Sequence, residues 1–183
     1  MGQGIAASAL TAGLDVTLVE RDEDSAAKAA AGIGKMLDSA VKRGKLDADA
    51  ASRMQSQAFH AVCSYELLSE VDLVIEAVFE SLEVKQEVFR TLDRICRPGA
   101  VLATNTSSLS VAAMAEVLEH PERLVGFHFF NPVAVLPLLE IVRADATDDA
   151  TLTVQVTDGP SAHLVAIGSP ASFGDTVTFD ASA

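Results

Sequence analysis

The chain has 183 residues, of which 49% are hydrophobic and 21% are charged, and it contains two cysteines and no tryptophan. This length suits one domain with a hydrophobic core, and the composition excludes disordered and disulfide-stapled proteins. The formal net charge of −13 repels polyanions, and no basic stripe offsets it, so we expect no nucleic-acid partner.

Two further classes of protein are excluded by the apolar segments. No apolar run approaches the roughly 20 residues that a membrane-spanning helix needs. The N-terminus also lacks the basic and then apolar pattern of a signal peptide. We therefore expect no membrane partner, a cytoplasmic location, and reduced core thiols at Cys63 and Cys96.

The first elements predicted along the chain are a helix, a strand and a helical hairpin. Gly2 to Gly13 is rich in small residues and ends at a glycine suited to a helix C-terminus. Residues 16–19 form an apolar, β-branched strand that ends at Glu20. Residues 22–43 and 47–58 are helical in pattern, and each segment begins with an aspartate able to cap it. This pair predicts a helical hairpin joined at Gly44.

Short strands separated by helices follow. The strands are expected at residues 60–63, 72–77, 100–104, 124–129 and 138–142. The helix at 81–96 places its apolar residues on one face and Lys85 elsewhere; these apolar residues are Val84, Val88, Leu92 and Ile95. Alternation of strands and helices predicts an α/β fold with a doubly wound parallel sheet. Beyond Asp145 only residues 163–167 resemble another strand.

The opening MGQGIA begins a helix that leads into a strand ending in an acid. This order is typical of the second half of a dinucleotide-binding βαβ unit in a Rossmann-like sheet. Gly2 would be the last glycine of the fingerprint, and Glu20 would hydrogen-bond the adenosine ribose, which favours NAD. Alternatively, Gly2 is only a small helix residue and Glu20 a solvated strand end, and Arg21 could accept a 2′-phosphate.

Three later stretches, ATNTSSLSV, GFHFFNPV and LPLLEIV, each close or follow a predicted strand. With these and DLVIEAVFESLEVKQEVF, the chain resembles the 3-hydroxyacyl-CoA dehydrogenase family from Met1 to about Ala150. The resemblance implies NAD as cofactor, an acyl-CoA as substrate and a homodimer in full-length relatives. It also implies oxidation of an L-3-hydroxyacyl-CoA to the 3-ketoacyl-CoA, in fatty-acid or related metabolism.

The resemblance implies a catalytic role for four residues. His128 matches the catalytic base, and Glu140 matches the carboxylate that fixes the imidazole tautomer. Ser107 and Asn131 match residues that hold the 3-oxygen of the substrate. Alternatively, His128 is a core histidine bonded to a backbone carbonyl. The turn that contains Ser107 could likewise serve only to start a helix from Val111, with Ser108 or Ser110 as its cap. Both alternatives stay open.

The family also implies cofactor contacts. Asn105 matches a cofactor-side position, while Glu80 and Lys85 match positions lining the nicotinamide pocket. An exposed surface lysine is the alternative for Lys85. No residue is singled out as a metal ligand.

Family members carry a strand and a glycine-rich turn before the Met-Gly of positions 1 and 2, and a helical domain at their C-terminus. We therefore predict that residues 1–150 form an NAD-binding domain whose first strand is missing, and that residues 151–183 form a divergent tail in place of the C-terminal helical domain. Two alternative functions remain: a catalytically inactive dinucleotide-binding fragment, and another Rossmann dehydrogenase that acts on hydroxy acids or sugars.

Overall fold

The computed structural model describes residues 1–133, 135–136, 138–149, 151 and 175–178. The described residues form two compact units, one made of residues 1–64 and 132–133 and the other of residues 65–131 and the described residues from 135 onward. The strand predicted at residues 163–167 lies outside the described residues. No helix among the described residues is long and apolar enough to cross a membrane.

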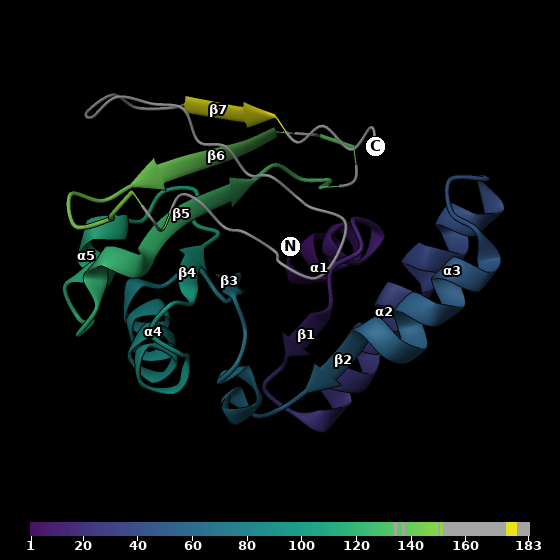
Figure 1. Ribbon diagram of the computed structural model, residues 1–183, viewed down its shortest axis with the longest axis horizontal. Coiled ribbons are helices and arrows are strands. Elements are labelled where there is room, and N and C mark those ends of the chain that lie inside the picture. The colour runs from purple at the N-terminus through teal and green to yellow at the C-terminus, as the bar shows by residue number, and fades with distance from the viewer. Residues whose placement is uncertain (134, 137, 150, 152–174, 179–183) are drawn as a thin grey trace. The chain divides into compact units, whose positions relative to one another are not determined.

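The first unit contains the helical hairpin and a two-stranded parallel sheet (Figure 1). Its elements are α1 (Gly2–Thr11), β1 (Val16–Val19), α2 (Glu23–Lys42), α3 (Ala48–Arg53), a π-helical turn (Met54–Ala58) and β2 (Phe59–Val62). Strands β1 and β2 are parallel, with Val16 opposite Phe59. Leu10 of α1, Ile33 and Leu37 of α2, and Phe59 form the buried core of this unit.

The predicted hairpin is confirmed in its caps and its turn. The Asp22 side chain accepts a hydrogen bond of 2.7 Å from the N–H of Ser25 at the start of α2. The Asp47 side chain accepts one of 3.0 Å from the N–H of Ala50 at the start of α3. Gly44 joins the helices with a φ of 68°, a left-handed conformation that glycine adopts without steric cost.

The second unit is built on a five-stranded sheet with the order β3-β4-β5-β6-β7. Its elements are a 3₁₀ turn (Tyr65–Leu68), β3 (Leu73–Glu76), α4 (Leu82–Ile95), β4 (Val101–Thr104), α5 (Val111–Ala115), a 3₁₀ turn (Pro121–Arg123), β5 (Leu124–Phe129), β6 (Leu138–Arg143) and β7 (Asp175–Thr178). Strands β3, β4 and β5 are parallel, as predicted, whereas β6 and β7 are antiparallel. Residues 130–137 connect β5 to β6, which is fewer than the roughly dozen residues that a parallel crossover needs, so the chain returns antiparallel.

The buried face of α4 differs from the prediction. Lys85, Phe89 and Leu92 are buried, whereas Val84 is 42% exposed. Lys85, Phe89 and Leu92 follow helical spacing, so they lie on one side of α4. The apolar pattern misplaced this face because it put the charged Lys85 outside it, whereas the Lys85 ammonium is buried in an ion pair with the buried Glu76.

Among the glycines of this unit that the structure describes, Gly126 in β5 has the tightest surroundings. A Cβ at this position would lie 2.9 Å from Cβ of Val142 in β6 and 3.1 Å from Cγ2 of Val111 in α5. Because β6 supplies the closest contact and is hydrogen-bonded to β5, its backbone has little freedom to move away.

Replacing Gly126 with alanine is therefore expected to lower the free energy of unfolding by about 1–3 kcal/mol. Urea unfolding of G126A and of the matched G2A variant measures the effect. A Cβ at Gly2 would meet no atom within 4 Å. Equal loss of stability in both variants would contradict the packing around Gly126.

Candidate active site

The candidate catalytic pair lies on adjacent strands of the second unit. His128 of β5 and Glu140 of β6 stand opposite each other in the antiparallel register. Nδ1 of His128 lies 2.8 Å from Oε2 of Glu140, and their side chains are 22% and 40% exposed. The neighbouring residues Phe127 and Phe129 pack in the apolar core of the sheet, so the alternation of a strand points His128 to the other face.

This contact assigns the tautomer of the neutral imidazole. A carboxylate only accepts hydrogen bonds, so Nδ1 of His128 must carry the proton that faces Glu140. Nε2 is then the proton acceptor of the ring. The pair therefore has the geometry of a general base whose orientation is fixed by an acid, rather than that of a histidine bonded to a backbone carbonyl.

A second group of charged residues lies at the carboxyl ends of β3 and β4. The ammonium of Lys85 is fully buried and donates to both carboxylate oxygens of Glu76, at 2.8 and 2.9 Å. It also lies 3.3 Å from Oε2 of Glu80. The hydroxyl of Thr104 and the N–H of Val78 complete the hydrogen bonding of Glu76, at 2.7 and 2.6 Å. The alternative of a surface position for Lys85 is therefore wrong.

Glu80 connects this charged group to the turn that carries Ser107. One carboxylate oxygen of Glu80 accepts hydrogen bonds from the Thr106 hydroxyl and, at 3.3 Å, from the N–H of Ser107. The Thr106 hydroxyl accepts in turn from the N–H of Leu109, at 3.0 Å. Ser107 itself is exposed. The cap alternative is confirmed for Ser110, one of the two serines predicted for it, because Ser110 caps α5 by accepting from the N–H of Ala113, at 3.2 Å.

The surroundings of Glu80 lower its pKa. Partial burial alone would raise the pKa, but the hydrogen bond from Thr106, the positive charge of Lys85 and the N–H of Ser107 together outweigh that effect. Since the folded pKa lies below the unfolded one, the carboxylate stabilises the fold above the ordinary glutamate range near pH 4.3. That contribution is lost as the pH falls through the folded pKa.

The expected result for Glu80→Gln is a loss of stability near neutral pH that shrinks on acidification below that range. Thermal unfolding of wild type and E80Q, measured from neutral pH to below about pH 4.3, checks this expectation. The matched control is Glu87→Gln, because Glu87 lies on the exposed side of α4. A difference between wild type and E80Q that stays constant with pH would contradict the role given to the carboxylate.

The remaining predicted site residues lie near strand ends or in the first unit. Asn105 follows β4, and its side-chain oxygen accepts a hydrogen bond of 2.9 Å from the N–H of Phe129. Asn131 is exposed, two residues beyond the end of β5. Gly2 and Glu20 belong to the first unit, which the structure does not place relative to the second.

The first unit fits the adenosine side of a dinucleotide. Helix α1 begins at Gly2, and its N-cap residue Met1 makes no side-chain cap. A Cβ at Gly2 would meet open space, so close packing does not explain this glycine, whereas close approach of a phosphate is sterically allowed. Glu20 directly follows β1, and its N–H bonds to the carbonyl of Val62 at 2.8 Å. Glu20 therefore lies at the carboxyl ends of these parallel strands, which is where dinucleotides bind in such sheets.

Glu76, the residue that holds Lys85, was not predicted from the sequence. A signal was present, because Glu76 is a lone acid in the last position of the apolar strand LVIE. Burial of an acid needs a positive partner. The partner is nine residues away on the next helix, a separation that no single-element periodicity reveals.

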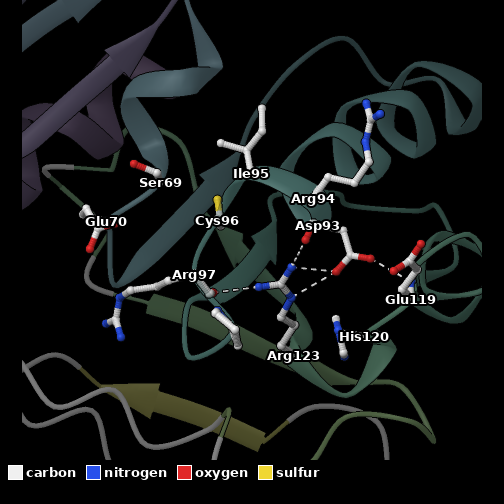
Figure 2. A pocket seen from close by; sticks show the side chains of 11 residues that line it. Ser69, Glu70, Asp93, Arg94, Ile95, Cys96, Arg97, Glu119, His120 and Arg123 are labelled. Carbon is white, nitrogen blue, oxygen red and sulfur yellow. Dashed lines mark hydrogen bonds and ion pairs between the residues drawn. The ribbon is translucent and has the colours of Figure 1, made fainter.

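A separate hollow of about 500 Å³ lies at the amino ends of β4 and β5, which is the opposite edge of the sheet (Figure 2). Its main feature is a buried ion pair between Arg123 and Asp93. The guanidinium also donates to the carbonyl of Arg97 at 2.9 Å, and Asp93 accepts from the N–H of Glu119 at 2.6 Å. These groups are occupied in joining α4 to the start of β5, which indicates a structural role.

Comparison with known proteins decides the family. The family model of the 3-hydroxyacyl-CoA dehydrogenase NAD-binding domain matches residues 1–158. The chain belongs to this family. Its cofactor is NAD, in agreement with the sequence prediction.

Three of the similar proteins illustrate the match. A 3-hydroxybutyryl-CoA dehydrogenase of Mycobacterium tuberculosis is 42% identical over 154 residues, which span 82% of this chain and 52% of that protein. A peroxisomal fatty acid beta-oxidation multifunctional protein of Arabidopsis thaliana is 38% identical over 147 residues, or 80% of this chain and 20% of that protein. The crystal structure of 3-hydroxybutyryl-CoA dehydrogenase from Escherichia coli has a TM-score of 0.79 and 41% identity, and the match covers 82% of this chain and 32% of that one.

The similarity therefore covers the NAD-binding domain, and the chain spans about half or less of the length of these relatives. The predicted Rossmann-like α/β fold is confirmed by the solved structures.

Proposed function

We propose that this chain forms the NAD-binding and proton-accepting part of an enzyme that oxidises an L-3-hydroxyacyl-CoA to the 3-ketoacyl-CoA. The observation that carries the proposal is the 2.8 Å contact between His128 and Glu140 on adjacent strands, within a chain of this family. The names of the relatives support a 3-hydroxybutyryl-CoA or similar acyl-CoA as the substrate.

In this proposal His128 accepts the proton of the substrate hydroxyl at Nε2. Bound NAD supplies the acceptor for the hydride that leaves the carbon atom of the same alcohol. Glu140 keeps the proton of the neutral ring on Nδ1 and stabilises the imidazolium that forms. A base positioned in this way typically raises the rate of the catalysed step by a factor of about 10²–10⁴.

The other site residues are proposed to bind and orient. Ser107 and Asn131 would donate hydrogen bonds to the 3-oxygen, a role supported by their polar, exposed side chains beyond β4 and β5. Glu80 would line the nicotinamide side, together with Asn105. Lys85 would act there through Glu80, since its ammonium is buried against two carboxylates. Gly2 and Glu20 would hold the pyrophosphate and the adenosine ribose.

Arg21 gives little support for a 2′-phosphate. Its guanidinium lies 3.0 Å from Asp22, and the acid of Glu20 precedes it. A phosphate at this place would meet two carboxylates beside one guanidinium. The arrangement therefore favours the unphosphorylated ribose of NAD.

A fusion protein tests the proposal. This chain is joined to the part of the M. tuberculosis relative that lies beyond the matched region, and NADH formation from L- and D-3-hydroxybutyryl-CoA is followed. We expect oxidation of the L-form only. A folded fusion that binds NAD and oxidises neither form would favour the inactive dinucleotide-binding alternative, and oxidation of a free hydroxy acid or sugar would favour another dehydrogenase.

The cellular setting is also proposed. A cytoplasmic location is supported by two free cysteines, and fatty-acid or related metabolism is supported by the acyl-CoA names of relatives. Cys96 is buried as predicted, whereas Cys63 is only partly buried. Since the A. thaliana relative is named as peroxisomal, fractionation of cells is the deciding measurement. A homodimer is proposed from what the resemblance implies for full-length relatives, and light scattering measures it.

A further inference from the structure

Asn105 joins three strands at the edge of the sheet that carries the candidate site. The ladder between β4 and β5 ends at the pair Thr104 and Gly126. Asn105 comes directly after it. Its backbone N–H donates to the carbonyl of Glu76 in β3, at 2.7 Å, and its side-chain oxygen accepts from the N–H of Phe129 in β5, at 2.9 Å. One residue therefore bonds to both neighbours of β4 beyond the end of the ladder.

The bond to Phe129 matters because this residue follows His128. N–H groups of successive strand residues point to opposite neighbours, so the N–H of Phe129 points toward β4 while that of His128 points toward β6. Strand β6 holds the end of β5 on one side through the pairs with Glu140 and Leu139. On the other side, the backbone of β4 no longer pairs with β5 beyond Thr104 and Gly126. There the side-chain oxygen of Asn105 accepts the hydrogen bond from Phe129 instead.

We propose that Asn105 is a positioning residue for His128. Its side chain extends the β4 ladder by one hydrogen bond and fixes the backbone that carries the imidazole. This role goes beyond the cofactor contact that the family resemblance implies, and its effect on turnover rests on the proposed function of His128. The two bonds of Asn105 also couple the end of β5 to Glu76, which holds Lys85.

Two substitutions separate the positioning role from a cofactor contact. Asn105→Leu keeps a similar volume and removes the acceptor oxygen. Asn105→Asp keeps an acceptor oxygen in the same place. It removes the amide N–H groups that could donate hydrogen bonds to a cofactor.

Hydrogen exchange of the Phe129 amide tests the bond without any need for turnover. We expect exchange about tenfold faster in N105L, and protection close to that of wild type in N105D. The amide of Phe127, at the core of the sheet, serves as the internal reference. Equal protection of Phe129 in N105L and wild type would overturn the proposal.

Steady-state kinetics of the fusion protein test the consequence. In N105L we expect kcat to fall on the order of tenfold, by more than the KM for NAD rises, and N105D to retain a higher kcat than N105L. A raised KM for NAD with an unchanged kcat would instead assign Asn105 to the cofactor alone and overturn the positioning role. If neither the wild-type fusion nor its variants turn over substrate, the proposed function fails. The exchange measurement still decides whether the hydrogen bond between Asn105 and Phe129 exists.

Discussion

Replacement of His128 by alanine is expected to lower kcat of the fusion protein by about 10²–10⁴-fold. The variant removes the ring that is proposed to accept the hydroxyl proton, and it removes no residue proposed to bind the cofactor. Stopped-flow or steady-state NADH formation measures kcat, and a fluorescence titration measures NAD affinity. The affinity is expected to change little, because His128 is proposed to act on the substrate rather than on the dinucleotide.

The matched control is His60→Ala. His60 lies in β2, is exposed, and has no part in the proposed site. H60A is expected to turn over like wild type. A kcat for H128A within about threefold of wild type would contradict the assignment of the base, since loss of a general base costs far more.

Replacement of Lys85 by methionine is expected to lower the free energy of unfolding by about 3–5 kcal/mol. Methionine fills a similar volume but leaves the Glu76 side chain, only 1% exposed, as a buried carboxylate without its positive partner. The remaining hydrogen bonds from Thr104 and the N–H of Val78 cannot supply a positive charge. Urea unfolding of K85M measures the loss.

The double variant Glu76→Gln with Lys85→Met separates the charge effect from packing. Neutralising both partners removes the uncompensated charge, so the double variant is expected to be more stable than K85M. Lys35→Met is the matched control, because Lys35 is exposed on α2, and it should change stability by less than about 0.5 kcal/mol. Additive losses in the double variant would contradict a coupled buried pair.

Much of the fold could be predicted because the deciding signals are local. Aspartate caps at Asp22 and Asp47 and the glycine turn at Gly44 lie within a few residues of the backbone groups they satisfy. Alternation of apolar strands and amphipathic helices likewise identified the parallel core of the sheet. The antiparallel direction of β6 was not predicted, because alternation alone does not specify the direction of a strand after a short connection.

The candidate site was predicted less completely, since its contacts join distant parts of the chain. The pair of His128 and Glu140 came from the family resemblance, and the register of β5 and β6 brings the two residues together. The bonds of Lys85 to Glu76 and of Asn105 to Phe129 were missed. Each depends on the position of a side chain across neighbouring elements, which hydrophobic periodicity does not report.

Transfer of deuterium tests the central claim most directly. The fusion protein is given L-3-hydroxybutyryl-CoA deuterated at C3, and the NADH formed is examined by mass spectrometry. Hydride transfer from C3 predicts that NADH gains the deuterium and that the solvent does not. Formation of 3-ketoacyl-CoA with the deuterium released to solvent, or NADH without the label, would contradict the proposed reaction.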